Sequence, residues 1–412
     1  MLKRIRVEQL TIGMHLKEFC GSWMEHPFWR SGFVIADPKD LASILASSIK
    51  EVWIDCDKGL DVAPGDSAVS QAESDAQVDA ELHQAAAVER DVGAVSMSVE
   101  IERAAKICAQ SKEAVVSMFR EARMGKTVDA GGAQQLVEEI ADSVIRNPGA
   151  LISLARLKTA DDYTYMHSVA VCAMMVALAK QLDLPDGEMR AAGVAGLLHD
   201  LGKAAMPMDV LNKPGKLTDE EFAIIKGHPV EGHKMLLSGS GVHPVALDVC
   251  LHHHEKTDGS GYPEGLKSDA ISLHAKMGAV CDVYDAITSN RPYKLGWDPA
   301  ESLRKMAEWA NGHFDPMVFQ AFVKSLGIYP IGSLVRLSSG RIGVVIEQTG
   351  KSLTTPRVKV FFSTKSNMRI TPVVIDLSAP GCPEKIAGRE DPGKWRFPDL
   401  NELWSGLAKP PW

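Results

Sequence analysis

The spacing of apolar residues separates a short mixed segment at the start of the chain from the regions that follow. Short apolar runs at residues 32–35 and 52–54 predict strands. Between them, Asp37 followed by Pro38 predicts the start of a helix, with aspartate as the N-cap and proline at the first helical position. Residues 1–56 are therefore predicted to form a small α+β domain.

Residues 57–95 have a different composition. Nine acidic and two basic residues lie between positions 57 and 92, with many Ala, Ser and Gln and few large apolar side chains. Such a composition is typical of a linker or a loosely held insertion. Residues 96–155 return to a helical period that breaks near residues 124–132, which predicts a helical connector.

From residue 156 to residue 328 the pattern is that of successive helices. A very apolar helix is predicted to begin after residue 162 and to end near Leu182. Further helix starts are indicated by a capping residue, by a capping box or by proline in the first turn, at Asp186, Thr218, His243, Ser272, Asp298 and Asp315. Since no clear strand interrupts this region, we expect an all-α domain.

After residue 329 the apolar period changes to two. Residues 333–337 and 342–347, joined by a turn at residues 338–340, predict a hairpin, and residues 357–362 and 373–377 predict two further strands. The last thirty residues are rich in Pro, Gly and Trp and are predicted to be an irregular tail. Residues 329–412 thus form a small C-terminal β module and tail in a multi-domain protein.

Composition and charge exclude several classes of protein. The formal charge of −8 over 412 residues argues against a binder of nucleic-acid polymers, which needs a basic surface. The longest apolar run, at residues 168–179, is too short to span a bilayer, and the start of the chain lacks the apolar core of a signal peptide. Seven scattered cysteines without a CxxC pair argue against a disulfide scaffold and favour a cytoplasmic location.

The distribution of histidine indicates where chemistry occurs. Nine of the 13 histidines lie between His167 and His274. The adjacent pair His199 and Asp200 can supply an imidazole to one ion and a bridging carboxylate to two. Imidazole and carboxylate are ligands for ions such as Mn, Fe, Co, Ni and Zn, and ligands from successive helices suit a metal site in a bundle core.

A single histidine on an apolar helix is usually a packed core residue, and His167 alone would be interpreted that way. The ordered set carries more weight, because each member lies on a separate predicted helix. The loop at residues 253–263, which reads His-His-Glu-Lys-Thr-Asp-Gly-Ser-Gly-Tyr-Pro, is the most specific feature. Its glycines permit a tight backbone course close to a ligand, although Asp-Gly-Ser-Gly by itself would suit an ordinary turn.

Together with His199, Asp200 and Lys203, this loop resembles the HD-GYP family of the HD phosphohydrolase superfamily over about residues 161–327. The resemblance implies an HD-type helical catalytic domain with two or three divalent ions. It also implies a phosphodiesterase in bacterial second-messenger signalling, which opens cyclic di-GMP to linear pGpG, with further cleavage to GMP where the linear product rebinds. Iron or manganese is the expected metal, with nickel, cobalt or zinc as alternatives.

The family motifs assign roles to positions of this sequence. The implied metal ligands are His167, His199, Asp200, His228, His253, His254 and Asp282. The implied catalytic residues are Asp200 and Lys203. The implied substrate-binding residues are Arg291, Lys294, Gly261, Tyr262 and Asp285. Asp285 lies three residues after Asp282 on the same helical face, so orienting a ligand histidine and a plain structural role are also open to it.

One position departs from the family pattern. Some members carry a glutamate four residues before the first ligand histidine, where it supports a third ion. Here that position is Tyr163, with Asp161 and Asp162 just upstream. Tyrosine is a poor ligand for a divalent ion, so the sequence favours a dinuclear site and leaves the role of His254 least defined. The N-terminal part resembles a domain of unknown function often fused to HD-GYP, which implies no chemistry.

Three alternative functions are open at this point. The first is hydrolysis of nucleotides or of other cyclic dinucleotides by an HD phosphohydrolase. The second is a slow scaffold that signals through a partner protein bound at the loop containing Gly261 and Tyr262. The third is a metal or redox sensor. Expected partners are cyclic di-GMP, a protein at that loop and a second copy in a homodimer.

Overall fold

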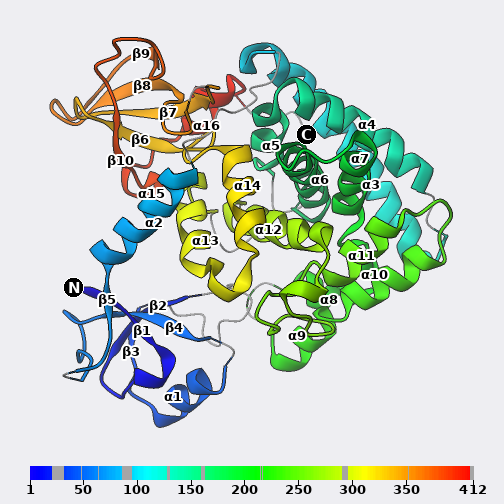
Figure 1. The fold of residues 1–412 in the computed structure, drawn as a ribbon, viewed down its shortest axis with the longest axis horizontal. Helices are drawn as coiled ribbons and strands as arrows, with labels where there is room; N and C mark the ends of the chain where they lie inside the picture. The colour runs from blue at the N-terminus through cyan, green and yellow to red at the C-terminus, as the bar shows by residue number, and fades with distance from the viewer. Residues whose placement is uncertain are drawn as a thin grey trace. The chain divides into compact units, whose positions relative to one another are not determined.

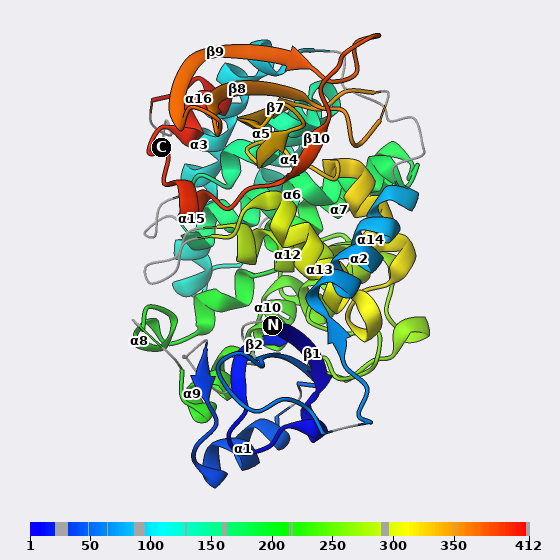
Figure 2. The same ribbon diagram turned by 90° about the vertical axis from the view of Figure 1, so that its left-hand side faces the viewer.

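The computed structural model describes residues 1–20, 32–47, 49–63, 65–85, 95–127, 130–158, 163–213, 215, 217–289, 296–350 and 352–408. The chain divides into two compact units. The first consists of Met1–Glu81 and Arg304–Asn311, and the second consists of Leu82–Leu303 and Gly312–Trp412. Figure 1 shows the elements of both units, and Figure 2 shows them from the side.

The first unit contains a five-stranded sheet in the order β3-β2-β4-β1-β5. Its elements are β1 (Leu2–Arg6), η1 (Val7–Gln9), β2 (His15–Cys20), β3 (Phe33–Val34), α1 (Pro38–Leu45), β4 (Glu51–Asp55) and β5 (Val69–Ser70). Asp37 caps α1 by accepting a hydrogen bond from the Lys39 amide, as predicted. Buried apolar side chains from the sheet and the helix, including Leu16, Ile44 and Val52, form its core. The predicted α+β class is confirmed.

Helix α2 (Gln71–Ala85) lies in the stretch where the sequence indicated a linker or insertion. Its residues are mostly Ala, Glu, Gln and Asp, and the first three types have high helix propensity. A low content of large apolar residues therefore did not prevent this stretch from forming a helix.

The helical part of the second unit is built around α6. Its first helices are α3 (Met97–Arg123), α4 (Ala130–Arg146), α5 (Pro148–Ala155), α6 (Tyr163–Gln181) and α7 (Asp186–Leu198). Helix α6 contacts α3, α4, α5 and α7, and it is apolar on all sides because it lies in the core. Pro185 rather than Asp186 is the N-cap of α7, one residue before the predicted position. None of the described helices is both long and apolar enough to cross a membrane.

Close packing of α6 and α7 depends on glycine. A Cβ atom at Gly196 would lie 3.0 Å from the backbone of Cys172, and one at Gly193 would lie 2.8 Å from the side chain of Val176. The absence of a side chain at these two positions lets the helix backbones approach each other. This approach brings the end of α7, where His199 and Asp200 lie, towards α6.

The rest of the helical part follows the predicted starts closely. Its elements are η3 (Leu201–Ala205), α8 (Met208–Leu211), α9 (Asp219–Ile225), α10 (His228–Leu237), α11 (Pro244–His252), η4 (Ser268–Ala270), α12 (Leu273–Thr288), α13 (Pro299–His313) and α14 (Pro316–Leu326). Thr218 and Glu221 form the expected capping box, and Ser272 caps α12 through the Ala275 amide. Between residues 163 and 326 the described residues form helices, turns and irregular segments, with isolated bridge residues at positions 240, 258 and 267 and no strand, so the all-α prediction is confirmed.

The C-terminal module is an antiparallel sheet in the order β10-β6-β7-β8-β9 (Figure 1). Its strands are β6 (Leu334–Leu337), β7 (Arg341–Glu347), β8 (Arg357–Ser363), β9 (Met368–Asp376) and β10 (Ile386–Arg389). The hairpin of β6 and β7 was predicted, and Gly340 at its turn has a φ of 82°, which favours glycine.

The prediction of an irregular tail is wrong. Strand β10 pairs with β6, and α15 (Pro392–Trp395) and α16 (Leu400–Ser405) follow it. Helix α16 contacts β7, and Trp404 is buried. The reason is that β10 is stabilised by pairing with a strand about fifty residues earlier, which a local apolar period does not reveal.

Candidate metal centre

Five helices of the second unit bring the candidate ligands together. His167 lies on α6, His199 and Asp200 follow α7, and Asp282 lies on α12. His228 is the first residue of α10, and His253 and His254 follow α11. Most of these side chains are buried, and His254 is partly so. The structure thus places all seven predicted ligands at one site.

A close backbone contact positions η3, the short helix that follows Asp200. A Cβ atom at Gly202 would lie 1.9 Å from the carbonyl oxygen of His228 and 2.5 Å from the amide of Gly232. Glycine is therefore required where η3 crosses the start of α10. This crossing sets His228 beside Asp200.

Asp200 lies at the middle of the site, and its two oxygens face different histidines. Its Oδ2 atom lies 3.4 Å from Nε2 of His167 and 3.4 Å from Nε2 of His199. Its Oδ1 atom lies 3.2 Å from Nε2 of His228 and 3.9 Å from Nε2 of His253. This arrangement suits a carboxylate that bridges two cations.

The side chains at the site include two ligand groups that share no residue, and a third group, His199, Asp200 and His253, overlaps both. His167, His199 and Asp282 form one, in which Nε2 of His167 lies 3.0 Å from Oδ1 of Asp282. His228, His253 and His254 form the other, in which the Nε2 atoms of His228 and His253 are 3.4 Å apart. The candidate ligand atoms within each group all lie within 4.8 Å of one another, which is compatible with coordination to a single ion.

Hydrogen bonds at Nδ1 orient four of the histidines. Nδ1 of His199 donates to the Gly196 carbonyl at 2.8 Å, and Nδ1 of His228 donates to the Ile225 carbonyl at 2.7 Å. His253 donates to the Val249 carbonyl at 3.0 Å, and His167 donates to Asp285 at 2.6 Å. These bonds turn the Nε2 atoms of the four imidazoles towards the ligand groups, as metal-ligating histidines require.

Two buried polar atoms support a cation at this site. Nε2 of His199 and Oδ1 of Asp200 are buried, and they make no hydrogen bond of normal geometry within the described residues. Buried polar atoms are nearly always satisfied, so such atoms need an explanation. A divalent ion with nitrogen and oxygen ligands would satisfy both, and the residues present fit such an ion.

The surroundings favour the metal-binding protonation states of His253, His254 and Asp200. Burial, reinforced by His199 and His228, lowers the pKa of His253 to about 3. Burial also holds the pKa of His254 well below its usual value. For Asp200 burial opposes ionisation, but the neighbouring Lys203 and His199 outweigh it and hold the pKa well below the usual range. Neutral imidazoles at His253 and His254 and an ionised carboxylate at Asp200 are therefore available together. At His167 burial opposes protonation, but hydrogen bonds with Asp282 and Asp285 outweigh it and raise the pKa.

Lys203 lies at the edge of the centre. Its ammonium contacts Oδ2 of Asp200, and its side chain is 23% exposed, so it faces both the ligands and solvent. Arg123 on α3 donates to the Lys203 carbonyl at 3.4 Å and to the Met206 carbonyl at 3.5 Å. A cation placed here can reach a substrate that approaches the metal side chains.

The loop after His254 is shaped by a buried glutamate. One oxygen of Glu255 accepts hydrogen bonds from the amides of Glu264 and Gly265 at 2.8 and 3.1 Å, and the other accepts from Leu266 at 2.9 Å. A Cβ atom at Gly261 would lie 2.4 Å from the amide of Lys256, so glycine is required there. The loop is therefore folded back on its own first residues.

The ring of Tyr262 covers the outer face of the second ligand group. The Tyr262 ring stacks on the His254 ring with the ring centroids 4.7 Å apart. The ammonium of Lys226, at the end of α9, lies 5.1 Å from the centroid of the Tyr262 ring. Tyr262 is partly buried. The stacking links the loop directly to a candidate ligand.

Comparison with known proteins identifies the family. A model of the HD domain matches residues 138–318, and a domain of unknown function, DUF3391, matches residues 2–133. A cyclic di-GMP phosphodiesterase of Pseudomonas aeruginosa is 57% identical over 410 residues, which cover 99% of this chain and 97% of that protein. This chain belongs to the HD-GYP family.

Other relatives are similar over a smaller share of the chain. The cyclic di-GMP phosphodiesterase response regulator RpfG of Xanthomonas campestris is 44% identical over 149 residues, 36% of this chain and 39% of that protein. The 3'3'-cGAMP-specific phosphodiesterase 1 of Vibrio cholerae is 36% identical over 164 residues, 40% of this chain and 38% of that protein. The similarity to the Pseudomonas relative thus extends over nearly the whole chain, whereas the similarity to these two covers less than half of it.

Asp285 does not occupy the substrate-facing position that the HD-GYP resemblance suggested. It is buried, and its Oδ2 atom is bonded to both Lys158 and His167. Because it lies behind a ligand histidine, Asp285 cannot contact a substrate that approaches from the metal side. Its geometry corresponds to the second role considered above, the orientation of a ligand histidine.

Several predicted HD-GYP positions lie outside the described residues. They are the substrate-binding candidates Arg291 and Lys294, the acidic residues Asp161 and Asp162, and the side chain of Tyr163. Two residues that surround the site were not singled out from the sequence for such a role, namely Lys158 and Glu255. Glu255 stands directly after the paired histidines and could have been noticed. Lys158 carries no comparable signal, because its partner is 127 residues away.

Proposed function

We propose that this protein is a metal-dependent phosphodiesterase that hydrolyses cyclic di-GMP to linear pGpG, and on to GMP where the linear product rebinds. The observation that carries the proposal is Asp200, whose two oxygens face two separate ligand groups. The 57% identity to a cyclic di-GMP phosphodiesterase over nearly the whole chain supports the substrate. The proposed setting is bacterial second-messenger signalling in the cytoplasm.

The proposed centre holds two ions. His167, His199 and Asp282 would bind the first, His228, His253 and His254 the second, and Asp200 both. The mixed imidazole and carboxylate set suits iron or manganese, with nickel, cobalt and zinc as alternatives. When bound, two divalent ions would supply a hydroxide nucleophile near neutral pH and neutralise charge on the phosphoryl oxygens.

The protein's own side chains supply the rest of the proposed reaction. Lys203 contacts the shared carboxylate from the solvent side, so its ammonium is placed to stabilise or protonate the departing 3′ oxygen of the ribose. Arg291 and Lys294 are the proposed contacts of the second phosphate, because guanidinium and ammonium groups bind phosphate oxygens. Gly261 and Tyr262 are the proposed loop residues beside the substrate.

The decisive variant is Asp200→Ala. We expect it to abolish hydrolysis of cyclic di-GMP and to lower bound manganese, because both ligand groups lose their shared oxygens. Asp269→Ala, at an exposed position of the same helical region, is the matched control and should retain both properties. Normal turnover and normal metal content in purified Asp200→Ala protein would refute the proposal.

A second substrate is favoured by one specific similarity. The 36% identity to a 3'3'-cGAMP-specific phosphodiesterase makes that dinucleotide the competing candidate. A panel of cyclic di-GMP, 3'3'-cGAMP and linear pGpG, compared by kcat/KM with manganese and with iron, separates the two. We expect the highest value for cyclic di-GMP, and a higher value for 3'3'-cGAMP would reassign the substrate.

The same assays test the other roles. Absence of turnover with either metal would favour a scaffold that signals through a partner at the Tyr262 loop, and reversible loss of activity in air would favour a redox sensor. A homodimer is also proposed, and sedimentation velocity tests it.

A further inference from the structure

A buried lysine stands behind the first ligand group. Lys158 follows α5 and is only 2% exposed, and its ammonium contacts Oδ2 of Asp285. A lysine is almost never fully buried without a partner, because removing its charge from water is costly. Asp285 is buried as well, so the two charges form an ion pair inside the protein.

The same carboxylate oxygen that binds Lys158 also orients a ligand. Oδ2 of Asp285 accepts a hydrogen bond from Nδ1 of His167 at 2.6 Å. On the other side of the imidazole, Nε2 faces Oδ1 of Asp282 at 3.0 Å and Oδ2 of Asp200 at 3.4 Å. The sequence of contacts therefore runs from the lysine through Asp285 and His167 to the metal-binding atoms.

His167 differs in this respect from three other ligand histidines. Those three donate to main-chain carbonyls of their own helical segments, which the backbone holds in place. His167 depends instead on a side chain from another helix, and a carboxylate on a rotatable bond needs further support. Lys158 provides a contact to the one oxygen that His167 uses, and Ser289 lies 3.4 Å from the other oxygen.

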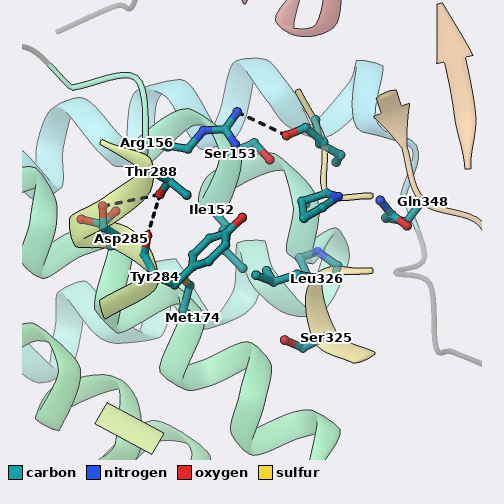
Figure 3. A pocket seen from close by; sticks show the side chains of 14 residues that line it. Ile152, Ser153, Arg156, Met174, Tyr284, Asp285, Thr288, Ser325, Leu326 and Gln348 are labelled. Atoms are coloured by element: carbon teal, nitrogen blue, oxygen red, sulfur yellow. Dashed lines mark hydrogen bonds between the residues drawn. The ribbon is translucent and has the colours of Figure 1, made fainter. Parts of the chain in front are cut away.

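The segment that carries Lys158 is itself anchored. Arg156 donates to the carbonyl of Ile331 at 3.2 Å, and the amide of Leu157 donates to the carbonyl of Leu154 at 2.8 Å. Figure 3 shows Arg156 and Asp285 lining the same pocket, with the dashed bond that runs from the arginine. The hydroxyl of Thr288 in this view bonds to main-chain carbonyls, which leaves the Asp285 carboxylate to its other partners.

We propose that Lys158 is a positioning residue of the metal centre, which acts through Asp285 to fix the imidazole of His167 towards the first ligand group. Its positive charge also balances one of three carboxylates, Asp200, Asp282 and Asp285, that lie buried close together. This inference rests on the metal centre proposed above. It assigns to Lys158 a role in metal affinity and no contact with substrate.

Two variants of Lys158 test whether its positive charge supports metal binding. Lys158→Met removes the charge at similar length, and Lys158→Arg keeps it. We expect Lys158→Met to weaken manganese binding by roughly 10- to 100-fold, the usual effect of losing a partner behind a metal ligand, and Lys158→Arg to retain most of the affinity. Titration calorimetry of the metal-free full-length protein measures this directly, without reference to activity.

A matched control separates metal positioning from general stability. Lys276 on α12 pairs with Asp315 at 3.0 Å in the same unit, and this pair contains no candidate ligand. Lys276→Met should bind manganese as the wild type does. The double variant Lys158→Met with Asp285→Asn removes both buried charges, so it should fold with a melting temperature near that of the wild type while its manganese affinity stays reduced.

The outcomes are distinguishable. If the wild type binds manganese and Lys158→Met or the double variant binds it equally tightly, the positioning role is overturned and the metal centre stands. If the wild type itself binds no manganese or iron, both proposals fall. If Lys158→Met does not fold, the other two variants test the positioning role. Weak manganese binding by the double variant and tight manganese binding by Lys158→Arg would support it.

Discussion

Asp200 shows how much can depend on one side chain. Its neighbours on the Oδ2 side come from α6 and the end of α7, whereas those on the Oδ1 side come from α10 and the end of α11. A glutamate would move the carboxylate by a methylene group, and an asparagine would replace one of its oxygens by a nitrogen that cannot bind a cation. At the scale of single residues, the site therefore depends on the chemical type and the length of one side chain.

The contact of Lys203 with Asp200 leads to a prediction at this scale. Lys203→Ala should lower kcat by roughly 100- to 1,000-fold, as is usual when one electrostatic group at a reacting oxygen is removed. Bound manganese should stay within error of the wild type, because Lys203 is not among the candidate ligands. Steady-state kinetics with metal analysis on the same sample measures both.

Lys213 offers the control for this variant. It pairs with Glu221 in the same helical region, away from the ligand groups. Lys213→Ala should keep kcat near the wild-type value. A Lys203→Ala protein with undiminished kcat would remove the lysine from the proposed reaction.

At the scale of elements, the loop after α11 is held by hydrogen bonds within itself and to residues 312 and 313. Glu255 accepts three backbone hydrogen bonds within it, and Tyr262 donates its amide to the His254 carbonyl at 3.2 Å. Buried amides that lose their acceptor are costly, because water cannot replace it. Glu255 thus contributes strongly to the shape of the loop.

Glu255→Ala should release this loop. We expect the unfolding free energy to fall by about 1–3 kcal/mol, because three amides lose their acceptor. Hydrogen exchange should accelerate at residues 264–266, whose amides are the donors. Glu264→Ala, an exposed neighbour, is the control and should leave the exchange of these amides slow. Unchanged exchange in Glu255→Ala would contradict this account of the loop.

In the C-terminal module, the buried glutamate Glu384 should make the stability of the folded protein depend on pH. Glu384 is 8% exposed and accepts hydrogen bonds from the Ser338 hydroxyl, the Ser339 amide and Arg341. Burial opposes its ionisation, but these donors outweigh it and lower its pKa to about 2. It therefore binds the turn between β6 and β7 to the strand β10 that follows it.

Because its pKa is lower in the folded state, ionised Glu384 stabilises the folded protein above the unfolded pKa of about 4.5. This stabilisation is lost as the pH falls from about 4.5 towards 2. Glu384→Gln should accordingly lower the unfolding free energy at pH 7 by about 1–3 kcal/mol. The difference from the wild type should shrink as the pH falls below about 4.5. Denaturant titrations at several pH values measure it, with the exposed Glu402→Gln as control. A pH-independent difference would contradict the proposed cause.

At the scale of the whole molecule, the metal centre couples separate helices. Candidate ligands come from five helices that also bury many apolar side chains, so the ions would join these helices at a cluster of buried histidines and aspartates. A ligand that binds only the folded state stabilises it by mass action. Metal binding and global stability should therefore be linked.

Removal of metal should lower the melting temperature of the full-length protein. Saturation at a free ion concentration 100 times the dissociation constant corresponds to about 2.7 kcal/mol for one site. Calorimetry with manganese and with a chelator measures this difference. In Asp200→Ala the two melting curves should coincide, and a shift as large as that of the wild type would show that the metal binds elsewhere.

Several elements whose formation depends on neighbouring residues were predicted from the sequence, and a strand that depends on a distant partner was not. Helix starts such as those after Thr218 and Ser272 were predictable, because capping depends on residues within one turn. The hairpin of β6 and β7 was predictable for the same reason. Strand β10 and helix α2 were missed, since the first depends on a distant partner and the second on propensity without an apolar pattern.

The sequence by itself determined the residue types of the candidate site, because the order of histidines and aspartates and the loop around Gly261 are properties of the chain. It also determined the helical class of the region that carries them. Only the tertiary structure decided which oxygen of Asp200 faces which histidine, that Asp285 lies behind His167, and that Lys158 is its partner. Such pairings arise when helices distant in sequence pack together, and they leave no periodic signal.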